Sequence, residues 1–168
     1  VLVRALAEPA LAETGAVGVI AGDVWPGQEH HEHRLRALVG ELELGERVRF
    51  TGFRDDVDNV YGAADVVVVP STRPDPLPNS AIEAAAAGCC VVAANHGGLP
   101  EIVKDNVTGR LVPPSDHRAL ASALADLVKH PRKVERLGDA ARADARRRFG
   151  AERFLTQVSA LYDELLRR

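Results

Sequence analysis

Two carboxylates eight residues apart are the side chains best placed for chemistry in this chain. Asp75 and Glu83 lie in the run DPLPNSAIEAAAAG, residues 75–88. A short, fully apolar run precedes them, at residues 66–69, and predicts a strand buried on both faces of a parallel sheet. A proline-rich turn follows, and then a helix that carries Glu83 in its second turn. This order places both acids at the carboxyl end of a buried strand.

The start of this helix predicts an anion site. Asn79 or Ser80 can cap the helix, whose first turn points free N–H groups and the positive end of its dipole at the sheet edge. Open α/β sheets bind ligands at that edge, and helix N-termini favour phosphate. An acid beside a phosphate is unfavourable unless it accepts hydrogen bonds from sugar or ribose hydroxyls. Since close packing is expected of the alanines after Glu83, we expect Glu83 to lie off the solvated face.

The elements that must position these acids alternate along the chain. Strands alternating with helices predict an α/β fold with a doubly wound parallel sheet. Pro9 disturbs the first helix, and Pro131 and Gly150 separate the last three. We expect strands at residues 17–22, 47–51, 66–69, 90–94 and 109–112. We expect helices at 1–14, 29–42, 57–64, 78–87, 116–129, 132–149 and 151–167, and a turn with a short helix within 96–103.

Composition narrows the class of protein. The 168 residues suffice for one domain or a little more, and 46% hydrophobic residues suffice for its core. A net charge of −3 gives no electrostatic reason to expect nucleic acid as a partner. Cys89 and Cys90 are adjacent in a predicted strand, so they indicate reduced, buried thiols and a cytoplasmic location. The chain has no Met, even at position 1, so we expect it to be a piece of a longer protein.

Two further clusters give weaker predictions. His30 and His33 share a helix face, but no carboxylate or cysteine cluster completes a coordination shell, so we expect no metal. Arg142 and the arginines at 146–148 are interleaved with acids, which favours a solvated helix face. The alternative for this basic stretch is peripheral contact at the inner face of a membrane.

In these residues the chain resembles glycosyltransferase family 4, retaining enzymes of the GT-B fold that use sugar nucleotides. The acids match the family's E-x7-E signature, except that the first acid is Asp75 rather than Glu. The resemblance covers nearly the whole chain and includes VIAGD at 19–23, RVRFTGFRDDV at 47–57, YGAADVVVVPS at 61–71 and the closing helix at 146–166.

The resemblance implies a domain organisation. Residues 1–149 would form the Rossmann-like, nucleotide-sugar-binding domain, the C-terminal half of a GT-B enzyme. Residues 150–168 would form a C-terminal helix that packs toward an N-terminal domain absent from this chain.

The resemblance also implies a hexosyltransferase-type activity, in which a sugar passes from a nucleoside diphosphate sugar to an acceptor hydroxyl. The absent N-terminal domain would bind the acceptor, and this chain alone would be inactive. Asp75 and Glu83 would be the catalytic residues, the first contacting the sugar and the second the ribose. No cofactor and no metal are implied. The remaining donor contacts are expected from Gly52, Phe53, Arg54, Leu77, Pro78, Asn79 and Ser80.

Several alternatives stay open on the sequence. A GT-B-like sugar-nucleotide epimerase is one, with loose support from HGGLPE at residues 96–101. A non-catalytic module that binds a nucleotide sugar or a partner is another. The base, the sugar and the acceptor are left open.

The resemblance finally predicts a gap in the sheet. The family's domain opens with a strand that this chain lacks, so its five strands would be the second to sixth in a 3-2-1-4-5-6 order. Loss of the central strand would leave about 10 Å between residues 17–22 and 66–69. We considered three ways to fill it: further upstream residues, a strand exchanged with a second copy in a domain-swapped homodimer, or direct closure of the sheet.

Overall fold

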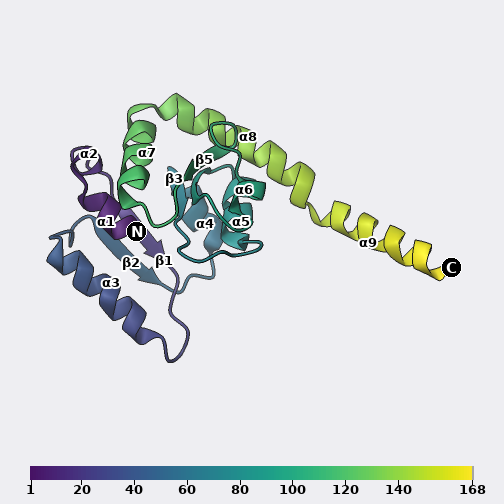
Figure 1. The fold of residues 1–168 in the computed structure, drawn as a ribbon, viewed down its shortest axis with the longest axis horizontal. Helices are drawn as coiled ribbons and strands as arrows, with labels where there is room; N and C mark the ends of the chain where they lie inside the picture. Colours follow the sequence, from purple (N-terminus) through teal and green to yellow (C-terminus); the bar gives the residue numbers. More distant parts are fainter. Residues whose placement is uncertain (168) are drawn as a thin grey trace.

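The computed structural model describes residues 1–167 and has alternating strands and helices (Figure 1). All five predicted strands are present, each within one residue of its expected bounds, so the fold class is confirmed as α/β. The strands are β1 (Gly18–Ala21), β2 (Val48–Gly52), β3 (Val66–Val69), β4 (Cys90–Ala94) and β5 (Gly109–Val112). The helices are α1 (Leu2–Ala7), α2 (Pro9–Ala12), α3 (Glu29–Glu41), α4 (Val57–Gly62), α5 (Asn79–Ala87), α6 (Leu99–Ile102), α7 (His117–Lys129), α8 (Pro131–Phe149) and α9 (Ala151–Leu166).

Local sequence explains where most helices begin and end. The single helix expected at residues 1–14 is two helices, because Glu8 is extended, with ψ 136°, and Pro9 starts α2 where its missing N–H costs nothing. Asp116 caps α7 by accepting hydrogen bonds from the N–H groups of Arg118 and Ala119 at 3.0 and 2.8 Å. Pro131 takes the first position of α8 in the same way as Pro9 takes that of α2.

The strands are parallel but form two sheets. β1 pairs with β2, and β3, β4 and β5 pair in that order. Among residues 1–167, β1 and β3 do not pair, so direct closure of the sheet is wrong. The sheet therefore divides at the place where the resemblance puts the central strand.

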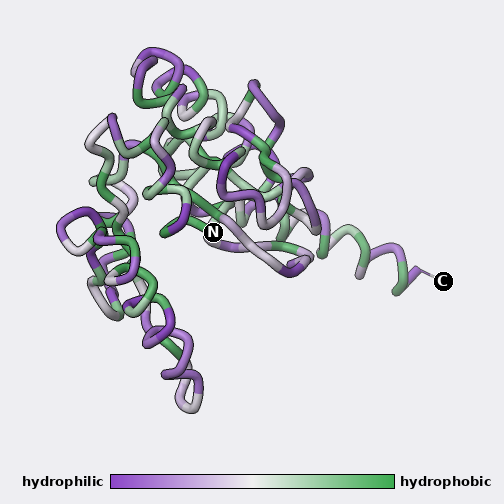
Figure 2. The backbone as a smooth tube through the Cα atoms, turned by 60° about the vertical axis from the view of Figure 1, so that its left-hand side comes forward, coloured by the Kyte–Doolittle hydropathy of each residue, from purple (hydrophilic) through white to green (hydrophobic). Residues whose placement is uncertain are grey.

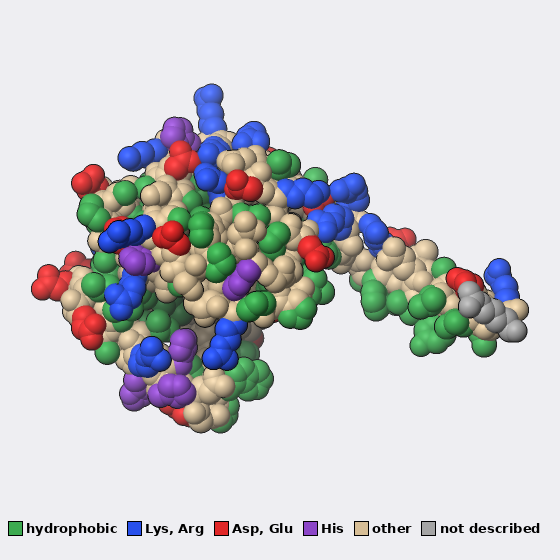
Figure 3. Space-filling model, viewed as in Figure 1, with side chains coloured by type: hydrophobic (Ala, Val, Ile, Leu, Met, Phe, Trp, Pro, Cys, Tyr) green, Lys and Arg blue, Asp and Glu red, His purple; other side chains and the backbone are tan. Residues whose placement is uncertain are grey.

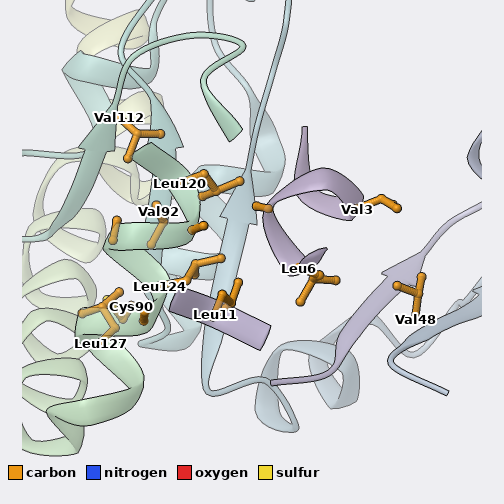
Figure 4. Close-up of a cluster of buried hydrophobic side chains, with 14 of the residues drawn as sticks. Val3, Leu6, Leu11, Val48, Cys90, Val92, Val112, Leu120, Leu124 and Leu127 are labelled. Atoms are coloured by element: carbon orange, nitrogen blue, oxygen red, sulfur yellow. The ribbon is translucent and has the colours of Figure 1, made fainter. Parts of the chain in front are cut away.

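Two apolar cores hold the layers together. The first joins both sheets through α1, α2 and α7, and Figure 4 shows Leu6 and Leu11 between Val48 of β2 and Val92 of β4. The second lies on the opposite face of β3–β4–β5, where α5, α6 and α8 pack. β4 is buried along its whole length, because both of its faces are covered, and hydrophobic segments gather in the body of the chain in Figure 2.

The last helix leaves this body. α8 packs along α5 and β4, whereas α9 projects beyond Gly150 and has no buried residue among those described (Figure 1). Apolar side chains gather on one side of α9 in Figure 3. The exposed large apolar residues of this helix include Phe154 and Tyr162, which are 65% and 64% exposed. Within residues 1–167, no helix combines the length and the apolar character that crossing a membrane requires.

Candidate functional site

The two acids follow β3 as the sequence predicts. β3 ends at Val69, a loop contains Asp75, and Glu83 lies in the second turn of α5. The expectation that Glu83 lies off the solvated face is wrong, since its side chain is exposed. The reason is the direction of packing: α5 buries the face formed by Ala81, Ala84 and Ala85, and Glu83 lies outside that stripe.

The N-terminus of α5 is open. The N-cap residue is Pro78, and no side chain caps the helix, so the prediction that Asn79 or Ser80 caps it is wrong. Both residues are already inside the helix, where their side chains cannot reach the N–H groups that a cap satisfies. Among the described residues, no hydrogen bond uses the N–H groups of Asn79 and Ser80. The positive end of the helix therefore faces solvent beside Leu77, whose side chain is 53% exposed.

Asp75 is exposed at the tip of the loop before this open terminus. One of its carboxylate oxygens, Oδ1, accepts a hydrogen bond from the Leu77 N–H at 3.0 Å. This bond turns the chain tightly into α5 and is typical of Asp in turns. Since a carboxylate has about four lone-pair sites, Asp75 keeps acceptor capacity for hydroxyl groups.

Tyr61 holds Glu83 and was not singled out from the sequence. The Tyr61 hydroxyl, on α4, donates a hydrogen bond to Oε2 of Glu83 at 3.0 Å. Burial, and then the Glu83 carboxylate, raise the pKa of Tyr61 to about 12, so the hydroxyl remains a donor at neutral pH. A tyrosine on a short helix just before the buried strand was the signal that the sequence offered.

The other predicted donor contacts lie at the end of β2, in the other sheet. The Gly52 carbonyl accepts a hydrogen bond from the Gly22 N–H at 2.9 Å, which joins the ends of β1 and β2. Phe53 is 76% exposed, and Trp25, after β1, is 79% exposed. Both strand ends of this sheet therefore present an aromatic ring to solvent.

Arg54 is engaged with a neighbouring acid. Its Nε and Nη2 donate to the two carboxylate oxygens of Asp56 at 2.7 and 2.5 Å. These bonds lower the pKa of Asp56 and raise that of Arg54. Arg54 would have to leave Asp56 before it could bind a phosphate.

The histidine pair and the basic stretch singled out from the sequence lie on α3 and α8. No group of three or more His, Cys, Asp or Glu residues is arranged to hold a metal ion in residues 1–167. Much of the basic stretch on α8 is paired: Arg147 and Arg148 donate to Asp144 at 2.5 and 3.0 Å, and Arg142 donates to the Ala87 carbonyl at 2.7 Å. Burial raises the pKa of Asp144, but the hydrogen bonds from Arg147 and Arg148 and the charges of Lys104 and Arg148 together lower it below its ordinary value.

Comparison with known sequences identifies a family. The family described as "Glycosyl transferases group 1" matches residues 1–144. A D-inositol 3-phosphate glycosyltransferase of Salinispora tropica is 37% identical over 173 residues, which cover 98% of this chain and 35% of that protein. The lipopolysaccharide core biosynthesis mannosyltransferase LpcC of Rhizobium leguminosarum is 30% identical and covered over 46% of its length. The chain thus spans between about a third and a half of these curated relatives.

Comparison with solved structures gives the same fold. HepE of Anabaena in complex with UDP superposes with a TM-score of 0.91 at 30% identity, over 97% of this chain and 44% of that one. HepE in complex with UDP-glucose gives 0.90 at the same identity. The C-terminal domain of a group 1 glycosyl transferase, LpcC of Francisella tularensis, superposes at 0.77 and 24% identity, over 89% of this chain and 77% of that domain. These neighbours confirm the GT-B-like architecture of the fold.

Proposed function

The chain belongs to the group 1 glycosyl transferases, and from this premise we propose that it binds the sugar-nucleotide donor of a retaining glycosyltransferase of family 4. The donor is a nucleoside diphosphate sugar, and an acceptor hydroxyl receives a hexose. This chain would be the C-terminal half of that enzyme, with residues 1–149 as the donor-binding domain. The complexes of HepE with UDP and UDP-glucose support a diphosphate nucleotide as ligand.

The open N-terminus of α5 between two exposed acids is the observation that carries this proposal. The free N–H groups of Asn79 and Ser80 and the helix dipole would stabilise the diphosphate, whose charge grows as the bond to the sugar breaks. Glu83 would accept hydrogen bonds from the ribose and Asp75 from the sugar. Holding both ends of the donor fixes the anomeric carbon for transfer.

The remaining residues fit subsidiary positions. Gly52 and Phe53, at the end of β2, would lie beside the base, and Leu77 and Pro78 would line the sugar and its phosphate. Arg54 would contribute only after exchanging Asp56 for a phosphate. No metal or other cofactor is required, because the helix terminus itself supplies the positive potential.

Binding of the acceptor would require a second domain of the whole protein. The apolar side of α9 would pack toward an N-terminal domain that binds the acceptor. Peripheral membrane contact and a strand-swapped homodimer are further proposals for the whole protein. The buried, unpaired thiols of Cys89 and Cys90 fit a cytoplasmic location, where sugar nucleotides are used.

Calorimetric titration of the full natural protein with a panel of nucleoside diphosphates and their sugars tests this proposal. Glu83→Ala should weaken binding of the diphosphate and of its sugar alike, by about tenfold or more, since a hydrogen bond to a charged group is lost. Asp75→Asn should reduce sugar transfer and leave the affinity for the free diphosphate nearly unchanged.

Two exposed acids outside the site serve as matched controls. Glu46→Ala and Asp139→Asn should leave both affinities unchanged. Unchanged diphosphate affinity in Glu83→Ala would refute the ribose role. Tight donor binding without transfer to any acceptor would instead identify a non-catalytic module.

A further inference from the structure

The loop that carries Asp75 is exposed, so something must hold it in place. Asp75, Pro76 and Leu77 all lie at the surface. The contacts that restrain them come from residues 96–98, which follow β4 and precede α6. In a parallel sheet, the loops after neighbouring strands meet at one edge, and β3 and β4 are paired neighbours.

Two glycines of this turn lie directly against the loop backbone. The Gly98 N–H donates a hydrogen bond to the Asp75 carbonyl at 2.8 Å. A Cβ atom at Gly98 would lie 1.9 Å from the Pro76 carbonyl oxygen, and one at Gly97 would lie 2.5 Å from that of Asp75. Contacts this short are excluded for carbon, so any side chain at either glycine displaces the loop. Gly98 has φ −79°, which every residue adopts, so only this contact requires glycine there.

His96 fastens the other end of the same loop. Its Nε2 lies 2.9 Å from the Ser71 carbonyl oxygen, two residues beyond the end of β3. Because a carbonyl can only accept, Nε2 carries the proton in this bond. The half-buried ring thus ties the start of the loop to the turn, while Gly98 ties its tip.

We propose that the turn of residues 96–98 fixes the position of Asp75, so that His96 and Gly98 are positioning residues for the donor's sugar. The inference rests on the proposed function for what Asp75 contacts. The diphosphate should be little affected, because the N-terminus of α5 is set separately, by packing of Ala81, Ala84 and Ala85. Loss of the turn should therefore weaken the hold on the sugar and spare the nucleotide.

Hydrogen exchange and calorimetry on the full natural protein test this inference. In Gly98→Ala, amide exchange at Leu77 and at position 98, whose N–H groups bond to Asp75, should rise. The ratio of the dissociation constants for UDP-glucose and UDP should rise about tenfold, as for loss of a charged hydrogen bond. The dissociation constant for UDP should change by less than about twofold. Gly40→Ala is the matched control, because a Cβ there would meet no atom within 4 Å.

A pair of variants at His96 keeps the test decisive if Gly98→Ala does not fold. His96→Phe removes the donor to the Ser71 carbonyl and should reproduce both the faster exchange and the higher ratio. His96→Gln keeps an N–H donor and should retain the exchange and the ratio of the wild type. Unchanged exchange at Leu77 and at position 98 in His96→Phe and Gly98→Ala would overturn the inference. So would faster exchange with an unchanged ratio. If the wild type binds neither UDP nor UDP-glucose, the proposed function fails for this donor, and exchange alone decides whether the turn holds the loop.

Discussion

The hydrogen bond from Tyr61 to Glu83 gives the sharpest prediction, because the chain contains only two tyrosines. Replacing Tyr162 by Phe leaves Tyr61 as the single ionising phenol. Its pKa should then be found at about 12, raised by burial and by the Glu83 carboxylate. The absorbance of tyrosinate after rapid jumps to high pH measures this value before the fold is lost.

Removing the charge of Glu83 separates the two causes. In Tyr162→Phe with Glu83→Gln, burial still raises the pKa of Tyr61, but the repulsion between phenolate and carboxylate is gone. The pKa should therefore fall below about 12 and stay above the usual value of 10.0. An unchanged pKa would show that the two side chains do not meet.

The exposure of Glu83 sets the loss of UDP affinity that we expect when its hydrogen bond from Tyr61 is removed. A hydrogen bond to a charged group contributes about 1.5–3 kcal/mol when it is shielded from water. Glu83 is exposed, so we expect about 1 kcal/mol after solvent screening, or roughly a fivefold loss of UDP affinity in Tyr61→Phe. Tyr162→Phe, on exposed α9, is the control and should bind UDP as the wild type does. Equal UDP affinity of the two variants would refute a role for Tyr61 in holding Glu83.

Three other predictions concern the scaffold. Because the pKa of Asp144 is lowered in the fold, its stabilising contribution is present above its ordinary value of 3.8 and is lost as pH falls through the lowered pKa; the stability difference between wild type and Asp144→Asn should shrink below pH 4 in urea titrations. Asp116→Ala should cost about 1 kcal/mol in the same assay, as a lost helix cap. Gly138→Ala should cost about 1–3 kcal/mol, since its Cβ would lie 2.2 Å from the Gly88 carbonyl oxygen, and Gly40→Ala should cost nothing.

Patterns that are local in the sequence predicted the structure well. Most strands are short, largely apolar runs, and such a run can be recognised from a window of a few residues. The position of Glu83 in the second turn of α5 followed from the same local reasoning. The lack of pairing between β1 and β3 followed from the resemblance, which placed the strands in order.

Properties that depend on packing could not be predicted in this way. Five alanines on α5 are chemically alike, yet Ala81, Ala84 and Ala85 are buried while Ala86 and Ala87 are exposed. Composition therefore could not show which face packs on the sheet, and Glu83 was assigned to the wrong side. The start of the helix failed for a related reason, since the chain enters it from Pro78 and leaves no room for Asn79 to act as cap.

The residues that hold the two acids in place could not be found from the sequence, because they lie far from the acids along the chain. Tyr61 holds Glu83 from helix α4, 22 residues away, and Gly98 holds Asp75 from the turn before α6, 23 residues away. Tyr61 is itself tied to the second core, where its carbonyl accepts a hydrogen bond from the Cys89 thiol at 3.3 Å.

All these links lie within the unit built on β3, β4 and β5, whereas Gly52, Phe53 and Arg54 lie on the sheet of β1 and β2. The geometry of the acids should therefore be independent of the sheet of β1 and β2. The distance from the acids to Phe53 depends instead on the first core, because no strand pairing among the described residues joins the two sheets. Recognition of the base should accordingly be sensitive to substitutions in that core, and recognition of the sugar should not.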